Sequence, residues 1–164
     1  MIDYSDLIQP DKGQDARTIH LVDKKSYDEW LKGRSARERA HLAAAVYKPE
    51  AFAHAILPGD DPEGWSVVTA VADTGNLSAW CLAKLAQALP EGRYRLDAHQ
   101  PGKALFGWMS AQYRFDTYRS RTEAGGARVL LTADVAAIAP MVAEMRSVAL
   151  VRDLVNTPAA DMGP

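Results

Sequence analysis

Cysteine and net charge are the two properties that the 164-residue sequence has least of. Cys81 is the single cysteine, so an internal disulfide is excluded. A chain of this length buries about 70% of its unfolded surface and needs no such bond to fold. Lys and Arg number 19 against 21 Asp and Glu, which gives a net charge of -2. A nucleic-acid partner is therefore not expected, because it would require a basic face.

Long apolar runs are missing as well, which argues against a membrane partner. Runs such as AHAIL and ALV are far shorter than the roughly 20 residues of a membrane-spanning helix. The first residues, MIDYSDLIQPDKGQDAR, lack the apolar segment of a signal peptide. Together with the single cysteine, this predicts a cytoplasmic protein. The length and the 48% of hydrophobic residues predict one globular domain.

The usual signatures of a catalytic or metal-binding site do not occur in the sequence. No two of the histidines His20, His41, His54 and His99 have the i, i+4 spacing of a helical zinc site. Cys81 lies on the apolar stripe of a predicted helix, which favours a buried, unreactive thiol. No G-x-S-x-G elbow, Walker A loop or G-x-G-x-x-G motif occurs. The residues therefore predict no catalytic residue, metal ligand or cofactor in this chain.

What the chain does contain is an alternation of strand and helix patterns. Strands are predicted at 17–22, 53–57, 65–72, 93–97 and 128–132. Helices are predicted at 26–33, 35–47, 78–89, 102–114 and 135–155. The link PGDDPEG is too short for a crossover helix, so the second and third strands should be antiparallel neighbours. The pattern predicts an α/β fold with a mixed, mostly parallel five-stranded sheet between helices.

Two local features refine this expectation. The helix starts are predicted to be capping boxes, formed by Ser26 with Glu29 and by Ser35 with Glu38. The strand at 65–72 has almost no polar face, which predicts a place at the centre of the sheet.

The polar residues 1–16 are interpreted as a flexible N-terminal arm.

One loop is a candidate for binding a small ligand. The loop after the third predicted strand consists of Asp73, Thr74, Gly75 and Asn76. It lies at a strand's carboxyl end and leads to a helix that Ser78 would cap, a place where N–H groups attract anions. A plain β-to-α turn is the alternative, because one glycine is too few to surround a phosphate. Gly125 and Gly126 precede a strand, which favours a flexible lead-in.

The segment YRFDTYR at 113–119 allows two interpretations as well. Its three aromatic side chains and two arginines could form a base-stacking surface. They could equally pin the C-terminal end of a helix, with the arginines near the negative end of the helix dipole. The acidic balance of the whole chain favours the structural interpretation.

Three segments match patterns that occur together in one enzyme family. RDLVNTPAADMGP at 152–164 is similar to a junction between two domains. YRFDTYR, preceded by FGW, is similar to a helix ending in Tyr-x-Phe-Asp-x-Tyr-Lys, with Arg119 in place of the lysine. LAKLAQALPEGRYRL at 82–96 is similar to a helix–strand step. The chain thus resembles the leucyl aminopeptidases, the cytosol aminopeptidase family of dinuclear metallopeptidases, well in its C-terminal half and poorly over residues 1–60.

The resemblance implies the N-terminal domain of an enzyme that removes N-terminal amino acids from peptides. Such a domain has a macro-domain-like fold and no catalytic residue, with roles in assembly, shielding or regulation. The family binds two divalent metals, zinc or manganese, through Gly-Lys-Gly-x-x-Phe-Asp-Thr-Gly-Gly and Asn-Thr-Asp-Ala-Glu-Gly-Arg sequences, and neither occurs here. The implied partners are a C-terminal catalytic domain and the other subunits of a hexamer. The implied division is an arm at 1–16, a domain at 17–155 and the start of a linker at 156–164.

The last predicted helix indicates where the two domains would meet. At about 20 residues it would be about 30 Å long, more than is needed to cover one sheet. Its final turns point apolar side chains in more than one direction, and an uncovered apolar patch usually marks an interface. We therefore predict interdomain docking, with apolar side chains exposed in this chain, at Leu150, Val151, Leu154, Val155, Asn156 and Pro158.

Two other functions stay open. A stand-alone macro-like module would bind a nucleotide or an ADP-ribose-like ligand near Asp73–Ser78 and Gly125–Gly126. Nucleic-acid binding, which some members of the resembled family show, is disfavoured by the net charge of -2 and by the lack of any Lys/Arg-rich run.

Overall fold

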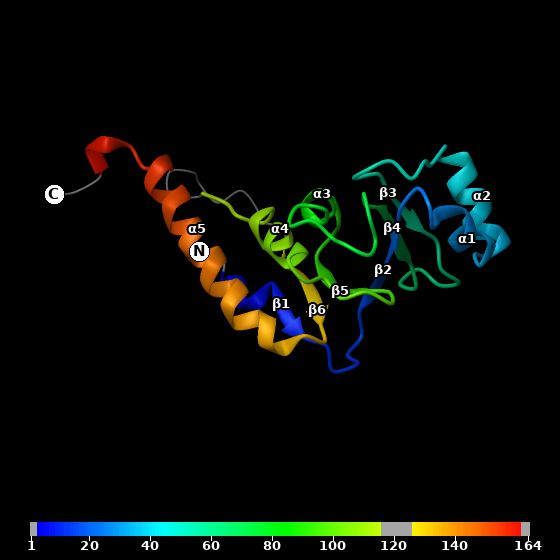
Figure 1. Cartoon of the computed structure of the whole chain (residues 1–164), viewed down its shortest axis with the longest axis horizontal. Coiled ribbons are helices and arrows are strands. Elements are labelled where there is room, and N and C mark those ends of the chain that lie inside the picture. Colours follow the sequence, from blue (N-terminus) through cyan, green and yellow to red (C-terminus); the bar gives the residue numbers. More distant parts are fainter. Residues whose placement is uncertain (1–2, 116–125, 162–164) are drawn as a thin grey trace.

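The computed structural model describes residues 3–115 and 126–161, which fold around one mixed sheet (Figure 1). The sheet has six strands in the order β1-β6-β5-β2-β4-β3. The strands are β1 (Ile8–Pro10), β2 (Arg17–Val22), β3 (His54–Leu57), β4 (Ser66–Ala70), β5 (Gly92–Leu96) and β6 (Arg128–Thr132). β3 and β4 are antiparallel, and the other neighbouring strands are parallel. The predicted class is confirmed, with six strands in place of five.

The antiparallel pair β3–β4 follows from the short link between the two strands. Ala55 lies opposite Val68 in the register that the link imposes. The loop 58–64 closes because Gly59 has no side chain: a Cβ there would lie 1.8 Å from the carbonyl oxygen of Gly64. β4 lies one strand from the edge rather than at the predicted centre. Side chains on both of its faces are nevertheless buried, because helices cover both sides.

The sixth strand comes from the N-terminal segment. A 3-10 helix, η1 (Tyr4–Asp6), leads into β1, which pairs with β6 at the edge of the sheet. Leu7 and Ile8 are each only 1% exposed. Ile8–Pro10 therefore belong to the sheet, and Tyr4, Leu7 and Ile8 to its core, which corrects the interpretation of this stretch as part of a flexible arm. A strand of three residues is too short to show alternation, and its Pro10 is tolerated only because β1 is an edge strand.

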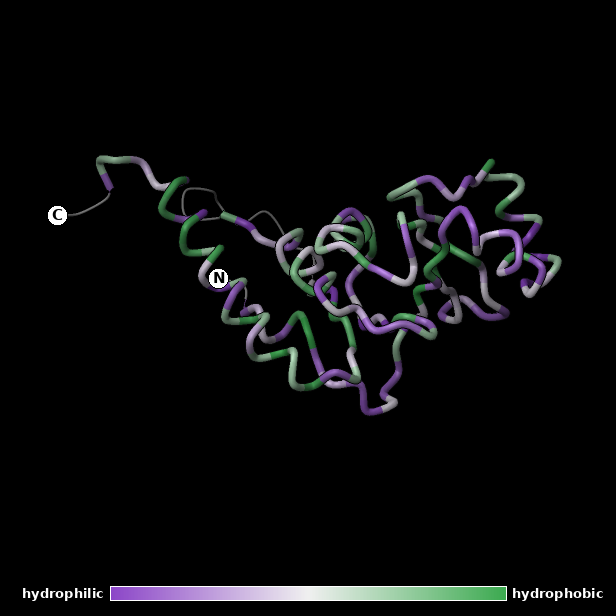
Figure 2. The backbone as a smooth tube through the Cα atoms, in the orientation of Figure 1, coloured by the Kyte–Doolittle hydropathy of each residue, from purple (hydrophilic) through white to green (hydrophobic). Residues whose placement is uncertain are grey.

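Helices cover both faces of the sheet. They are α1 (Tyr27–Lys32), α2 (Ala36–Ala44), α3 (Ala83–Ala88), α4 (Ala104–Ser110) and α5 (Ile138–Asn156). The larger core lies between the sheet and α3, α4 and α5. A smaller core lies under α1 and α2, against β2, β3 and β4. Figure 2 shows hydrophobic segments along the strands and helices that meet in these cores.

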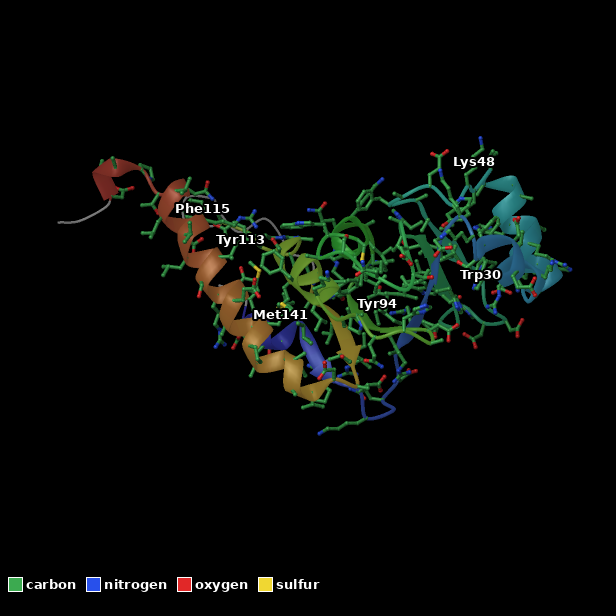
Figure 3. The ribbon with its side chains drawn as sticks, in the orientation of Figure 1. Trp30, Lys48, Tyr94, Tyr113, Phe115 and Met141 are labelled. Atoms are coloured by element: carbon green, nitrogen blue, oxygen red, sulfur yellow. The ribbon has the colours of Figure 1, made fainter. Side chains whose placement is uncertain are left out.

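Large aromatic side chains in the larger core keep their polar atoms paired. Tyr94 and Trp108 are fully buried, with ring centroids 5.8 Å apart. The Trp108 Nε1–H donates to the carbonyl of Arg128 at 2.9 Å, and the Tyr94 hydroxyl donates to the carbonyl of Pro90 at 2.7 Å. These bonds remove the cost of burying an unpaired donor, so both rings can fill the core. Tyr94 is labelled near the middle of the molecule in Figure 3.

Of the two predicted capping boxes, the one at α2 is confirmed. Glu38 N–H donates to the Ser35 hydroxyl at 3.1 Å, and Ser35 N–H donates to the Glu38 carboxylate at 2.8 Å. At α1 the prediction is wrong. The Ser26 hydroxyl accepts from Asp23 N–H, while the Asp23 carboxylate accepts from Ser26 N–H. The Ser26 hydroxyl and the Ser26 N–H, which a capping box with Glu29 would use, are thus both bonded to Asp23 instead.

Three helices are shorter than predicted. α2 ends at Ala44 rather than near 47, and one contact explains part of the difference at α3. α3 begins at Ala83 rather than at 78, and Ser78 does not cap it. A Cβ on Gly107 of α4 would lie 2.1 Å from the carbonyl oxygen of Ala79, so this glycine lets the chain before α3 approach α4 closely. α4 itself ends at Ser110 rather than near 114. The last helix starts as a 3-10 turn, η2 (Val135–Ala137), and continues as α5.

Candidate functional site

The loop 73–76, predicted as a ligand site, uses its backbone N–H groups within the chain. Thr74 N–H donates to the Asp23 carboxylate at 3.0 Å, and Gly75 N–H donates to the Asp73 carboxylate at 2.8 Å. Asn76 N–H donates to the carbonyl of Asp73 at 3.3 Å. The bond from Thr74 N–H, ahead of its other contacts, holds the pKa of Asp23 well below its usual range. A carboxylate of the chain thus occupies the place where a ligand anion would bind, which favours the plain turn.

The second predicted glycine site shows the same chemistry. Gly126 N–H donates to the Glu91 carboxylate at 2.8 Å. Gly125 lies outside the described residues. At both loops, therefore, amide donors bond to a carboxylate of the chain itself, as Thr74, Gly75 and Gly126 do.

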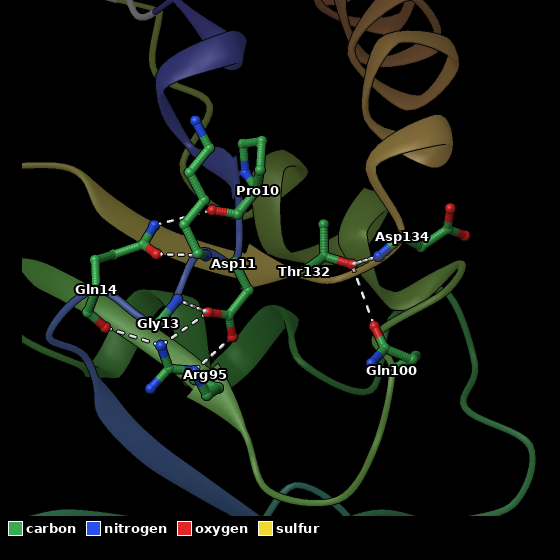
Figure 4. A network of polar contacts seen from close by, with 9 residues as sticks. Pro10, Asp11, Gly13, Gln14, Arg95, Gln100, Thr132 and Asp134 are labelled. Carbon is green, nitrogen blue, oxygen red and sulfur yellow. Dashed lines mark hydrogen bonds and ion pairs between the residues drawn. The ribbon is translucent and has the colours of Figure 1, made fainter.

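The carboxyl edge of β1, β5 and β6 is filled by a polar network (Figure 4). Arg95 of β5 donates from Nη2 to the Asp11 carboxylate at 2.9 Å and to the carbonyl of Gln14 at 2.8 Å. The hydrogen bond from Arg95 lowers the pKa of Asp11. The Thr132 hydroxyl, at the end of β6, accepts from Asp134 N–H at 3.1 Å. This edge, where parallel sheets often bind ligands, is used here to tie the strands together.

His20 and Cys81 both lie in buried surroundings. His20 is 8% exposed, and its Nδ1 lies 2.9 Å from the Asp97 carboxylate. Burial lowers the pKa of His20 in spite of this carboxylate. Cys81 is 6% exposed, and burial raises the pKa of its thiol. Both are packed as structural residues, and residues 3–115 and 126–161 contain no group of three His, Cys, Asp or Glu side chains placed to hold a metal ion.

The end of α5 is different, because it exposes apolar side chains together. Leu150 is 61% exposed, Val151 58%, Leu154 52% and Val155 79%. The predicted exposure of these four side chains is confirmed. At positions i, i+1, i+4 and i+5 they form one contiguous stripe on the helix, which we call the α5 apolar surface. In Figure 1 this end of α5 extends beyond the sheet, and Figure 2 shows hydrophobic residues continuing to its last turns.

The opposite side of the same turns is polar and faces the domain. The Tyr113 hydroxyl donates to the Asp153 carboxylate at 2.6 Å, and the Asn156 amide donates to that hydroxyl at 3.3 Å. The Arg152 guanidinium lies 3.9 Å from the centroid of the Tyr113 ring and donates to the carbonyl of Ser110 at 3.3 Å. We call these five residues the Tyr113 cluster. It fixes the end of α5 to the end of α4 and to the chain that follows it; Figure 3 labels Tyr113 beside α5.

The Tyr113 cluster bears on the segment YRFDTYR. Tyr113 contacts α5, which is a structural role, but α4 ends at Ser110, so Tyr113 does not lie at a helix C-terminus as the structural interpretation expected. Residues 116–119 lie outside the described residues, so the base-stacking alternative is not tested over most of its length. Sequence reasoning missed the roles of Arg152 and Asp153. The available signal was a charged pair inside an otherwise apolar helical stripe, which points to a polar contact on that face.

α5 ends where the sequence places the start of a linker. Thr157 is extended, and both its N–H and its hydroxyl bond to the carbonyl of Asp153, the latter at 2.7 Å. Pro158 follows, is exposed and begins the turn into η3 (Ala159–Asp161). Asn156, predicted to take part in docking, is exposed but lies on the side of the Tyr113 cluster. No helix in the described part of the chain combines the length and apolar character needed to cross a bilayer.

Comparisons with known proteins agree with this architecture. A family model described as M17 aminopeptidase, N-terminal domain, matches residues 18–132, well over half of the chain. A search of curated protein sequences gives no match. The cytosol aminopeptidase of Coxiella burnetii superposes with a TM-score of 0.82 at 24% identity, over 97% of this chain and 35% of that one.

Two further solved structures share the fold at lower similarity. The bottromycin maturation enzyme BotP gives a TM-score of 0.66 at 20% identity, over 92% of this chain and 35% of that one. A mutant of tomato leucine aminopeptidase gives 0.56 at 14% identity, over 93% of this chain and 38% of that one. The chain therefore spans little more than a third of the length of these proteins.

Proposed function

Because the chain belongs to the M17 aminopeptidase family, as its N-terminal domain, we propose that it acts by docking a catalytic domain through the end of α5. The enzyme so formed would remove N-terminal amino acids from peptides. The domain itself would contribute assembly, shielding or regulation rather than catalysis. The observation that supports this most is the reversal along α5, whose last turns direct polar groups inward and apolar groups outward.

The α5 apolar surface is large enough to matter energetically. Burying an aliphatic side chain fully is worth about 1.5–3 kcal/mol, so covering four that are more than half exposed would contribute a few kcal/mol in total. The Tyr113 cluster adds rigidity. It fixes the direction in which the end of α5 leaves the domain, so that less conformational freedom is lost when the partner docks.

Finer features of the intact enzyme are part of the same proposal. Its catalytic domain would bind two divalent metals, zinc or manganese, and it would assemble as a cytoplasmic hexamer with the N-terminal domains outside. The resemblance of the segments at 82–96, 113–119 and 152–164 supports these features. A solved structure of BotP in complex with Mn, which is similar in fold, supports only the proposal that the catalytic domain binds a metal.

The docking role is tested by binding between this chain and the separately produced catalytic domain of the same enzyme. Calorimetry would compare the wild-type chain with Leu154→Asp and with a control, Val135→Asp. Val135 is 56% exposed, much like Leu154 at 52%, but it lies at the far end of the helix. We expect Leu154→Asp to weaken binding at least about tenfold, the effect of about 1.4 kcal/mol, and the control to change it little. Equal effects of the two variants would contradict the proposal.

A further inference from the structure

A cavity of about 590 Å³ lies at the amino ends of β2, β4, β5 and β6, away from the carboxyl edge and from α5. Its lining includes two acidic residues, two arginines, one tryptophan and a glycine: Asp15, Glu63, Arg17, Arg93, Trp65 and Gly64. Its volume lies within the range of about 300–1,000 Å³ that small-molecule sites occupy. It contains charges of both signs around one indole ring.

Arg17 is the best-fixed charge in this cavity. Its Cζ lies 4.4 Å from the centroid of the Trp65 ring, and that ring packs against buried Tyr94 with centroids 6.3 Å apart. Gly92 has φ +145°, and a Cβ on it would lie 2.7 Å from Nη1 of Arg17. The glycine thus leaves the room that the guanidinium occupies. These contacts fix the plane of the guanidinium before any ligand arrives.

The hydrogen-bonding edge of Arg17 is only half used. Nη2 donates to the Glu63 carboxylate at 3.0 Å, whereas Nε is buried and has no hydrogen-bond partner among the described residues. Nε–H and Nη2–H point the same way and match the two oxygens of one carboxylate. A buried donor without a partner is costly, and such an atom often marks a place for a missing acceptor. The Glu63 side chain is 86% exposed, so its ion pair with Arg17 is weak and displaceable.

We propose that this cavity binds the carboxylate of a free amino acid or of a short peptide's C-terminus, which displaces Glu63 and pairs with both Nε–H and Nη2–H of Arg17. A carboxylate suits the site better than a phosphate does. It is planar like the guanidinium edge, and its single charge is repelled less by Asp15 and Glu63 than the double charge of a phosphate. The rest of the ligand would fill the space beside Trp65 and Arg93.

The test is an NMR titration of the 164-residue chain, monitored at the indole N–H of Trp65. The ligands are the tripeptide Leu-Gly-Gly, its C-terminal amide, leucine and inorganic phosphate. We expect the tripeptide acid to shift the resonance with a Kd of about 1 mM and the amide to leave it unchanged. Leucine distinguishes the two sources of the carboxylate, and the inference is supported whether or not it binds as well as the tripeptide.

Substitutions make the test specific to Arg17. Glu63→Gln removes the competing carboxylate from an exposed position, so it should tighten binding of the tripeptide by about threefold while the fold is kept. Arg17→Met should weaken binding at least about tenfold. Arg37→Met, at an exposed position on α2 outside the cavity, is the control and should have no effect.

Three outcomes would overturn the inference. They are equal binding of the acid and the amide, phosphate binding as tight as that of the acid, and no change with Glu63→Gln. If Arg17→Met fails to fold, Glu63→Gln and the amide still decide the result. No residue of the α5 apolar surface takes part, so failure here would leave the docking proposal standing.

Discussion

Residues 138–149 and 150–156 belong to one continuous helix, yet they place their apolar side chains on opposite sides. In the first part Val142, Met145 and Ala149 face the sheet and are at most 7% exposed. In the second part the face toward the domain has Arg152 and Asp153, and the apolar residues point to solvent. The first part thus closes a core, and the second part presents a surface.

The difference shows that hydropathy along α5 does not by itself distinguish core from interface. The first part is rich in Ala, Val and Met and the second in Leu and Val, and Figure 2 shows hydrophobic residues along both. What separates them is the direction of the side chains and the polar contacts on the inner face. A helix that is held in place by hydrogen bonds and a cation–π contact can leave its apolar residues free for a partner.

The largest effect is expected where the first part of α5 fills the core. Met145 is fully buried, so Met145→Ala should leave a cavity and lower the free energy of unfolding by about 3 kcal/mol. Urea unfolding of the 164-residue chain would measure this loss. Leu154→Ala is the matched control on the same helix and should cost less than about 0.5 kcal/mol. Similar losses for both variants would erase the distinction between the two parts.

A smaller effect is expected from the Tyr113 cluster. Tyr113→Phe removes the hydroxyl that donates to the Asp153 carboxylate, which should lower the free energy of unfolding by about 1 kcal/mol. A double-mutant cycle with Asp153→Ala should assign most of this loss to the pair. Hydrogen exchange should become faster at the amides of 150–156 and stay unchanged at those of 140–147. Equal changes in exchange rate at 140–147 and 150–156 would contradict the inference that the Tyr113 cluster stabilises only the end of α5.

The same hydroxyl predicts a dependence on pH. Burial, followed by the hydrogen bond to Asp153, raises the pKa of Tyr113 above its ordinary value of 10.0. The folded chain therefore keeps its proton when the unfolded chain loses it. The stabilisation by this phenol is complete below pH 10 and is lost as pH rises through the folded pKa. The stability difference between wild type and Tyr113→Phe should accordingly be constant up to about pH 10 and shrink above it, as urea titrations at several pH values would show.

Much of the fold could be predicted from the sequence because its signals are local. Ser35 and Glu38 form the predicted capping box, and the Pro- and Gly-rich link makes β3 and β4 antiparallel as predicted. One error came from a neighbouring residue and one from a distant residue. Asp23 accepts from the N–H of Ser26, three residues along the chain, and also from the N–H of Thr74, 51 residues away. Only the second contact depends on the tertiary fold, and no spacing in the sequence shows it.

The candidate site also has one part that could be predicted from the sequence and other parts that could not. The exposed side chains of the α5 apolar surface could be predicted, because an unbroken apolar helix longer than its sheet must leave some of them uncovered. The Tyr113 cluster and the cavity around Arg17 could not. Tyr113 and Asp153 are 40 residues apart, and Arg17 and Glu63 are 46 apart, so only the tertiary fold brings them together.

The smallest effect on stability is expected at the α5 apolar surface itself. Leu150→Ser and Val155→Ser change side chains that are 61% and 79% exposed, so each should alter the free energy of unfolding of the 164-residue chain by less than about 0.5 kcal/mol. Together they should nevertheless abolish most of the binding to the catalytic domain, because docking would bury what folding leaves exposed. Urea unfolding and calorimetry on the same preparation would check both statements. A stability loss near that of Met145→Ala would mean that these side chains close the domain's own core, and the docking proposal would then lose its basis.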